Sequence, residues 1–156
     1  MERLALFLLC LAANLAQAAP TTEQLVGIWQ CTHEIAAGWN ETFRFFPNGT
    51  VIWNANQMDD EKRLIERRGK WSLEGNSLRV ELTEETVLVG GRHARQGEAN
   101  DGESMWVGSK SVKRKMAKPT IEVTPITTPK DQNGYPSMNM FERRFWRMKA
   151  DPKDYS

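Results

Sequence analysis

The chain has little cysteine, and this shortage limits how its fold can be stabilised. Its 156 residues contain two cysteines, Cys10 and Cys31. Cys10 lies in an apolar N-terminal segment that we expect to be removed, which would leave Cys31 alone and exclude an intramolecular disulfide. The mature fold must then be stabilised by packing.

Catalytic signatures are also missing from the sequence. The chain contains no G-x-S-x-G, H-E-x-x-H, phosphate-loop or C-x-x-C pattern. Its paired carboxylates, Asp59-Asp60 and Glu84-Glu85, fall in segments where solvation explains them. We therefore expect neither an enzyme nor a bound cofactor.

An excess of one charge is lacking too, since 21 basic residues face 20 acidic ones and the net charge is +1. This balance gives no reason to expect nucleic acid or an anionic membrane as a partner. One basic cluster could bind a lipid head group, an acidic polysaccharide or an acidic protein, although lysines that protect an exposed strand edge explain it as well. Its members are Lys110, Lys113, Arg114, Lys115 and Lys118.

Long apolar runs are absent except at the N-terminus. The run Leu4–Leu11 follows a basic residue and leads into Ala16-Gln17-Ala18, a small-x-small cleavage signal. It is about half the roughly 20 residues that would span a bilayer. We therefore predict that residues 1–18 are a signal peptide cleaved near Ala18, that the mature chain has no transmembrane segment, and that it is periplasmic or secreted.

Two hairpins are the clearest structural signals in the mature chain. The first joins Glu41–Phe46 to Thr50–Asn56 through Pro47-Asn48-Gly49, because Asn-Gly readily adopts the positive φ angles of a tight turn. The second joins Gly69–Leu73 to Ser77–Thr83. In both hairpins apolar and polar residues alternate, as they do in a strand with one buried face.

Weaker alternation completes the pattern. We expect further strands at residues 25–35, 86–89, 104–112, 120–126 and 140–148, and loops at 92–103 and 127–137. Residues 58–68 could form a helical turn or a polar strand. About eight strands without alternating helices predict an all-β fold, an antiparallel up-and-down meander closed into a barrel. One domain would cover residues 19–149, followed by a loose tail at 150–156.

Three motifs within residues 25–82 resemble those of the lipocalin-like domains of exported bacterial proteins, which are calycin-type β-barrels. The matches are L-x-G-x-W at Leu25, Gly27 and Trp29, F-x-F-x-x-(D/N)-G-T from Phe43 to Thr50, and G-x-W-x-(I/L)-x-G-(N/D)-x-L from Gly69 to Leu78. The resemblance implies that an arginine near the last strand packs over the opening tryptophan. Arg147, or Arg144 as the second choice, would do this for Trp29, unless both are solvated.

The barrel interior is the expected binding site. An eight-stranded barrel can hold one small ligand, or its own side chains can fill it. The leading hypothesis is thus a monomer that binds a small apolar or amphipathic ligand. The alternative is a periplasmic interaction module, an enzyme inhibitor or immunity protein, that acts through the loops at 92–103 and 127–137. The expected interior residues are Trp29, Cys31, His33, Phe43, Phe45, Val51, Trp53, Trp71, Leu73, Leu78 and Val80.

Cys31 and His33 allow a weaker alternative function. Two residues apart on one expected strand, they would face the same way. With a third group they could bind a metal or haem, or act as a nucleophile and its base. His93, the only other histidine, falls in a predicted polar loop. A buried thiol beside a histidine at the barrel mouth explains the pair without chemistry, and we expect no metal site.

Overall fold

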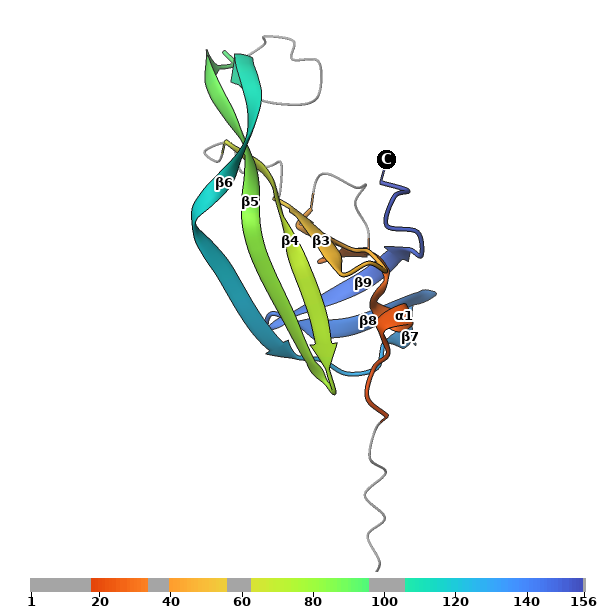
Figure 1. Ribbon diagram of the computed structural model, residues 1–156. Coiled ribbons are helices and arrows are strands. Elements are labelled where there is room, and N and C mark those ends of the chain that lie inside the picture. The colour runs from red at the N-terminus through yellow and green to blue at the C-terminus, as the bar shows by residue number, and fades with distance from the viewer. Residues whose placement is uncertain (1–17, 34–39, 56–62, 96–105, 156) are drawn as a thin grey trace, which may run out of the picture.

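The computed structural model describes residues 18–33, 40–55, 63–95 and 106–155, so almost all of the predicted signal peptide lies outside it. Within these ranges the chain is all-β, with one short helix before nine strands (Figure 1). The elements are α1 Thr22–Leu25, β1 Gly27–Gln30, β2 Thr42–Phe45, β3 Thr50–Asn54, β4 Leu64–Glu74, β5 Ser77–His93, β6 Trp106–Pro125, β7 Lys130–Gln132, β8 Tyr135–Met140 and β9 Arg143–Lys149.

The strands form one antiparallel sheet in the order β6-β5-β4-β3-β2-β1-β9-β8-β7. Strand β9 pairs with β1, so the first and last parts of the domain lie side by side and the sheet curls around a common interior (Figure 1). The predicted meander is confirmed. The edge strands β6 and β7 do not pair with each other, so the described ladder stays open.

Both predicted hairpins are confirmed in register. Phe45 faces Val51 and Phe43 faces Trp53 across the first hairpin. In its turn, the Thr50 backbone N–H donates to Asn48 Oδ1 at 3.0 Å. In the second hairpin Trp71 faces Val80. Both turns form at the glycines predicted from the sequence, Gly49 and Gly75, which have positive φ.

Three expectations about the strands were wrong in the same direction, because the strands continue further than predicted. Residues 86–89 belong to β5, and residues 106–112 and 120–125 belong to one strand, β6. Gly90 and Gly91, which follow the predicted strand at 86–89, have positive φ angles within the ladder. Register irregularities, such as the one near Leu82, let a strand continue past residues that break regular pairing.

The C-terminal third differs most from expectation. Residues 140–148 do not form one strand, because a two-residue turn at Phe141 and Glu142 separates β8 from β9. Both turn residues have positive φ, 53° and 61°. Asn-Gly is the usual sequence signal for such a turn, so the Phe-Glu pair did not predict it. The predicted loop at 127–137 contains another hairpin, with Asn133-Gly134 in its turn.

The opening segment is also shorter than predicted. Residues 25–35 were expected to be one strand, but Thr22–Leu25 forms a helical turn and β1 ends at Gln30. The helix begins with a capping box, in which the Thr21 side chain accepts from the Gln24 N–H and the Gln24 side chain accepts from the Thr21 N–H. Residues 34–39 lie outside the described ranges.

The core fills the closed end of the curled sheet with large apolar side chains. It takes one face of β1–β5, β8 and β9, as the alternation predicts. Its fully or nearly fully buried members are Leu25, Trp29, Phe43, Phe45, Val51, Trp71, Leu78, Val80, Leu82, Ile126, Met138, Met140 and Phe145.

The C-terminal tail is not loose, contrary to expectation. Pro152 is buried, and the Tyr155 ring lies against the Arg44 guanidinium, with Cζ at 4.4 Å from the ring centroid. Arg44 points away from the core because its neighbours Phe43 and Phe45 point into it. The tail thus covers part of the outer face of β2, and such contacts are what keep a chain terminus in place.

Titration of Tyr155 checks this docking. Burial raises the pKa of its phenol, and the nearby Arg44 only partly opposes the rise. The pKa of an unfolded tyrosine is about 10. The neutral phenol therefore stabilises the docked tail fully below that pH, and this contribution is lost as the pH rises through the higher folded pKa. Tyr155→Phe removes the tyrosinate absorbance of this one residue. The difference between the wild-type and variant pH titrations should therefore have its midpoint above pH 10. A midpoint at or below 10 would contradict docking.

Candidate functional site

One end of the curled sheet is closed by Trp29 and Arg147. Trp29 is fully buried, and its indole Nε1 donates to the Leu25 carbonyl at 2.7 Å. Arg147 lies opposite Trp29 in the β1–β9 ladder and donates to the Gln24 carbonyl at 3.2 Å. Arg144 instead donates to Gln132 Oε1 at the surface. Of the two candidate arginines, Arg147 is the one beside the tryptophan.

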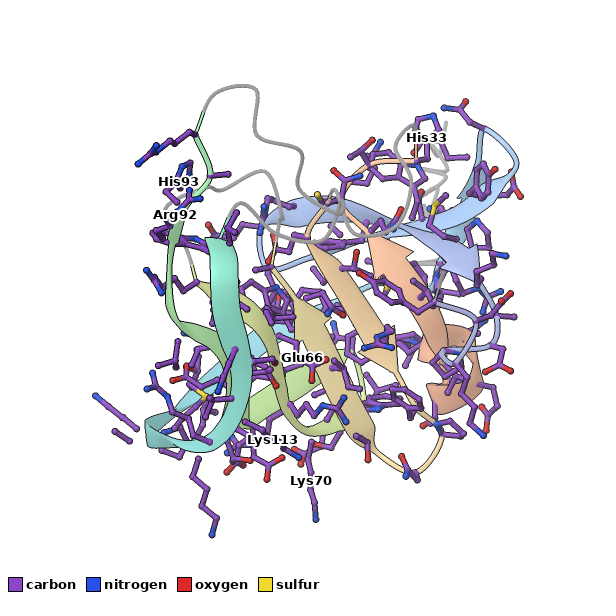
Figure 2. All side chains as sticks on the ribbon, turned by 90° about the horizontal axis from the view of Figure 1, so that it is seen from above. His33, Glu66, Lys70, Arg92, His93 and Lys113 are labelled. Atoms are coloured by element: carbon purple, nitrogen blue, oxygen red, sulfur yellow. The ribbon has the colours of Figure 1, made fainter. Side chains whose placement is uncertain are left out.

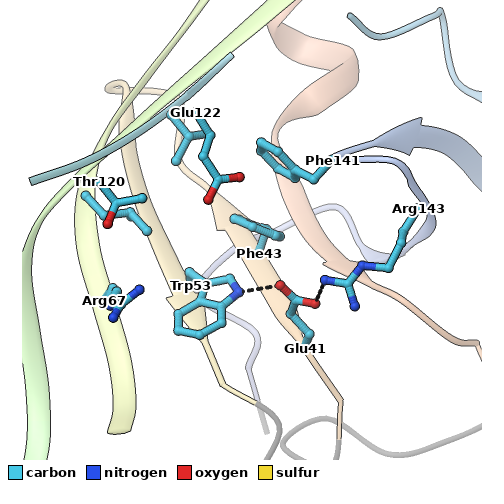
Figure 3. Close-up of a pocket in the computed structure, with 10 residues that line it drawn as sticks. Glu41, Phe43, Trp53, Arg67, Thr120, Glu122, Phe141 and Arg143 are labelled. Atoms are coloured by element: carbon cyan, nitrogen blue, oxygen red, sulfur yellow. Dashed lines mark hydrogen bonds and ion pairs between the residues drawn. The ribbon is translucent and has the colours of Figure 1, made fainter. Parts of the chain in front are cut away.

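The other end contains a pocket of about 220 Å³, the candidate functional site (Figure 3). It lies on the inward face of the sheet, above the packed core. Its lining comes from β2–β6, from the residue that precedes β2, from the β8–β9 turn and from the first residue of β9. The lining residues are Glu41, Phe43, Trp53, Arg67, Val80, Leu82, Thr120, Glu122, Phe141 and Arg143.

Aromatic and aliphatic side chains make the floor of the pocket. Phe43 stacks on Phe141 with ring centroids 5.0 Å apart, and Val80 and Leu82 lie beside them on β5. Phe141 reaches this position from the positive-φ turn between β8 and β9, and its backbone N–H donates to Thr124 Oγ1 on β6 at 3.1 Å. The turn therefore holds an aromatic ring in the floor of the pocket.

Charged groups make the rim of the pocket. The Glu41 carboxylate accepts from Trp53 Nε1 at 2.8 Å with one oxygen and from Arg143 with the other (Figure 3). Arg67 lies over the Trp53 ring, with Cζ at 5.5 Å from the centroid. Glu122 extends from β6 into the pocket, and no other described residue forms an ion pair with it (Figure 3). An apolar floor below convergent polar groups can hold an amphipathic ligand.

Most of the predicted interior residues fill the core instead of lining this pocket. Phe43, Trp53 and Val80 do line it. Cys31 and Leu73 pack against the core from partly buried positions. The residues buried in the core below the pocket are Trp29, Phe45, Val51, Trp71 and Leu78.

The charged half of the site was not predicted from the sequence. Leu82 could have been found, because it continues the alternation of Leu78 and Val80. Thr120 and Glu122 face Leu82 and Val80 across β5 and β6, and no local pattern gives the register of such distant strands. Glu41 and Arg143 meet only because β1 and β9 pair.

Cys31 and His33 do not share a face, so this expectation was wrong. Strand β1 ends at Gln30, and Cys31 lies in a bend where strict alternation stops. Cys31 packs against the core. The His33 ring lies 5.1 Å from Trp146, which points outward because its neighbour Phe145 is in the core. The thiol and the imidazole therefore do not form the interior pair expected from the sequence.

The two histidines are also far apart. His93 lies at the end of β5, where its ring is 5.3 Å from that of Trp106, and His33 is at the opposite side of the molecule (Figure 2). Within the described ranges, no three His, Cys, Asp or Glu side chains come together as a metal site would require.

The basic cluster lies along the edge strand β6. Lys113 pairs with Glu84 at 2.8 Å, and Arg114 pairs with Glu85 at 2.9 Å, both across the β5–β6 ladder. The side chains of Lys110, Lys115 and Lys118 are exposed. This placement fits lysines that protect a strand edge.

None of the protein families, curated proteins or solved structures compared with the chain matches it. In the part of the chain that the structure describes, no helix has the length and apolar character to cross a membrane. The functional assignment therefore depends on the pocket.

Proposed function

We propose that the chain is an exported, lipocalin-like protein that binds a small amphipathic ligand in the pocket at the mouth of its curled sheet. One observation carries the proposal: an aromatic floor at Phe43 and Phe141 lies directly below the charged side chains of Glu41, Arg67 and Glu122. A ligand with an apolar body and a polar end would contact both.

The size of the pocket limits the ligand. Sites for drug-sized molecules have volumes of about 300–1,000 Å³, and this pocket has about 220 Å³. At about 30 Å³ for one water, it holds a ligand with the volume of roughly seven waters. The packed core below it, from Trp71 to Trp29, leaves the mouth as the place for the ligand.

The closed end supports the lipocalin-like part of the proposal. A short helix leads into Gly27 and Trp29, and Arg147 of the last strand lies beside the tryptophan. The resemblance implies an arginine of the last strand near this tryptophan, and the register of Arg147 opposite Trp29 supports that part of the proposal. Export rests on the N-terminal segment of the sequence alone.

A pair of matched substitutions on β6 tests the pocket. Thr120 lines the pocket, whereas Val123 is 61% exposed on the outer face. Thr120→Phe should fill the pocket and lower the affinity for octanol, a small amphiphile, by more than about tenfold, because a bulky ring displaces ligand atoms. Val123→Phe should leave the affinity unchanged. Isothermal titration calorimetry measures both, and equal effects would contradict the assignment.

Native mass spectrometry of protein purified from the exported fraction of its host provides an independent test. Wild-type protein should retain a small-molecule mass that Thr120→Phe loses. A bare monomer that co-purifies with another protein would instead favour the inhibitor or immunity function.

A further inference from the structure

A second hollow of about 740 Å³ adjoins the mouth pocket. The two hollows share Trp53 and Arg67, so they meet at these two side chains. The second hollow, here called the arginine groove, is lined by Trp53, Arg63, Leu64, Arg67, Glu85, Val87, Leu88, Val89, Gly90 and Arg114.

The strand register places the key side chains of the groove on the inward face. Arg67 faces Trp53 on one side and Glu85 on the other, and Glu85 faces Arg114. The next inward row is apolar, with Val87 between Leu64 and Val112. Charged and apolar rows thus lie next to each other on one surface, as an amphiphile requires.

The apolar row is open to solvent in the described structure. Val89 is 49% exposed and Val112 is 40% exposed, although both belong to the face that is buried lower in the sheet. Exposed apolar side chains that extend a pocket commonly mark a binding surface. Leu64 and Val87 continue this surface toward Trp53 and the mouth pocket.

The charges of the groove do not balance. Its lining has three arginines and one carboxylate, Glu85. Glu85 is shared between Arg114 at 2.9 Å and Arg67 at 3.8 Å. Arg63 contacts the Gly90 carbonyl and lies 3.6 Å from the centre of the Trp106 ring. Two positive charges therefore remain without a carboxylate among the lining residues.

Arg67 is the least satisfied of the three arginines. Its 3.8 Å contact with Glu85 is longer than the roughly 2.7–2.9 Å of a charge-assisted hydrogen bond. Its Nε is buried without a hydrogen-bond partner. A buried donor without an acceptor is destabilising, so an anionic oxygen placed here would satisfy it. Arg67 also lies where the two hollows meet.

We propose that the ligand is a single-chain anionic amphiphile. This inference rests on the proposed function and adds the charge of the ligand and its orientation. Its anionic head binds Arg67, with Arg114 and Arg63 nearby. Its apolar chain passes Trp53 and ends on the floor of the mouth pocket. Glu122 on the opposite rim forms no ion pair with another of the described residues, so it disfavours the reverse orientation, in which the anion would lie beside its carboxylate.

Three probes with the same chain and different heads test the charge: octanoate, octanol and octylamine. Isothermal titration calorimetry on the full chain should show that octanoate binds at least about tenfold more tightly than octanol, because charge-assisted hydrogen bonds to arginine add to the same apolar contact. Octylamine should bind more weakly than octanol. Added salt should weaken octanoate binding and leave octanol binding nearly unchanged.

Arginine variants locate the head group. Arg67→Gln and Arg114→Gln should each reduce the affinity for octanoate, by about tenfold for Arg67, with less than a twofold effect on octanol. Arg79→Gln is the control, because Arg79 lies on the outer face of β5 and, among the described residues, its ion pair is with Glu81 at the surface. Circular dichroism checks that each variant folds, and Arg114, whose side chain is 57% exposed, is the safer change.

The possible outcomes separate the two proposals. Equal binding of the three probes, or tighter binding of octylamine, would overturn the anionic assignment and leave the small-ligand function standing. No binding of any probe would overturn both. Octanoate selectivity that survives both Arg67→Gln and Arg114→Gln would also overturn the assignment.

Discussion

Trp29→Ala is expected to lower the free energy of unfolding by about 3–5 kcal/mol, the usual cost of truncating a buried aromatic side chain to alanine. The Trp29 side chain is fully buried where β1 meets β9. Its loss would leave a cavity at the closed end and remove the donor to the Leu25 carbonyl. Urea denaturation followed by circular dichroism measures the change.

The matched control is Val123→Ala on the outer face. Val123 is 61% exposed, so its truncation should change the free energy of unfolding by less than about 0.5 kcal/mol. If Trp29→Ala cost no more than this control, the packing of the closed end would not stabilise the fold, and the structural basis of the lipocalin-like proposal would be lost.

Gly69→Ala should have the second large effect. Gly69 lies in β4 at a register irregularity, and a Cβ atom there would lie 1.7 Å from the Glu81 carbonyl oxygen and 2.8 Å from the Leu82 Cα. Both neighbours are backbone atoms, so the two strands must separate. We expect a loss of at least about 2 kcal/mol in the free energy of unfolding.

Gly75→Ala is the control for this substitution. Gly75 has a φ of +60° in the β4–β5 turn, and a Cβ atom there would meet nothing within 4 Å. Its cost should be that of the backbone conformation alone, about 1–2 kcal/mol. Thermal and urea unfolding of both variants compares the two costs. A larger loss for Gly75→Ala would show that strand approach at Gly69 is not limiting.

The parts of the fold that follow from local chemistry were predicted from the sequence. Asn48-Gly49 specified the β2–β3 turn, and the alternation around it placed Phe43 and Trp53 on the inward face. The turn at Phe141 and Glu142 was missed because those residue types do not favour positive φ. Contacts made elsewhere, such as the Phe141 stack on Phe43, hold that turn.

Only the apolar half of the candidate site was predicted, because only that half follows from local alternation. Apolar alternation identified Phe43, Trp53 and Val80. Glu122 enters the pocket only through the pairing of Val80 with Glu122, and sequence spacing does not set that register. His33 was misplaced because alternation was extended past the end of β1.

The pairing of β1 with β9 also affects how the chain must fold during synthesis. Strand β2 follows β1 closely along the chain, but the other neighbour of β1 is the last strand of the domain. Trp29 therefore cannot pair with Arg147 until nearly the whole domain has left the ribosome. Contacts between residues so distant in sequence slow folding, because the entropy of loop closure must be overcome first. A chain released without its last strand would leave one edge of β1 unpaired, an edge on which another chain could add and start aggregation.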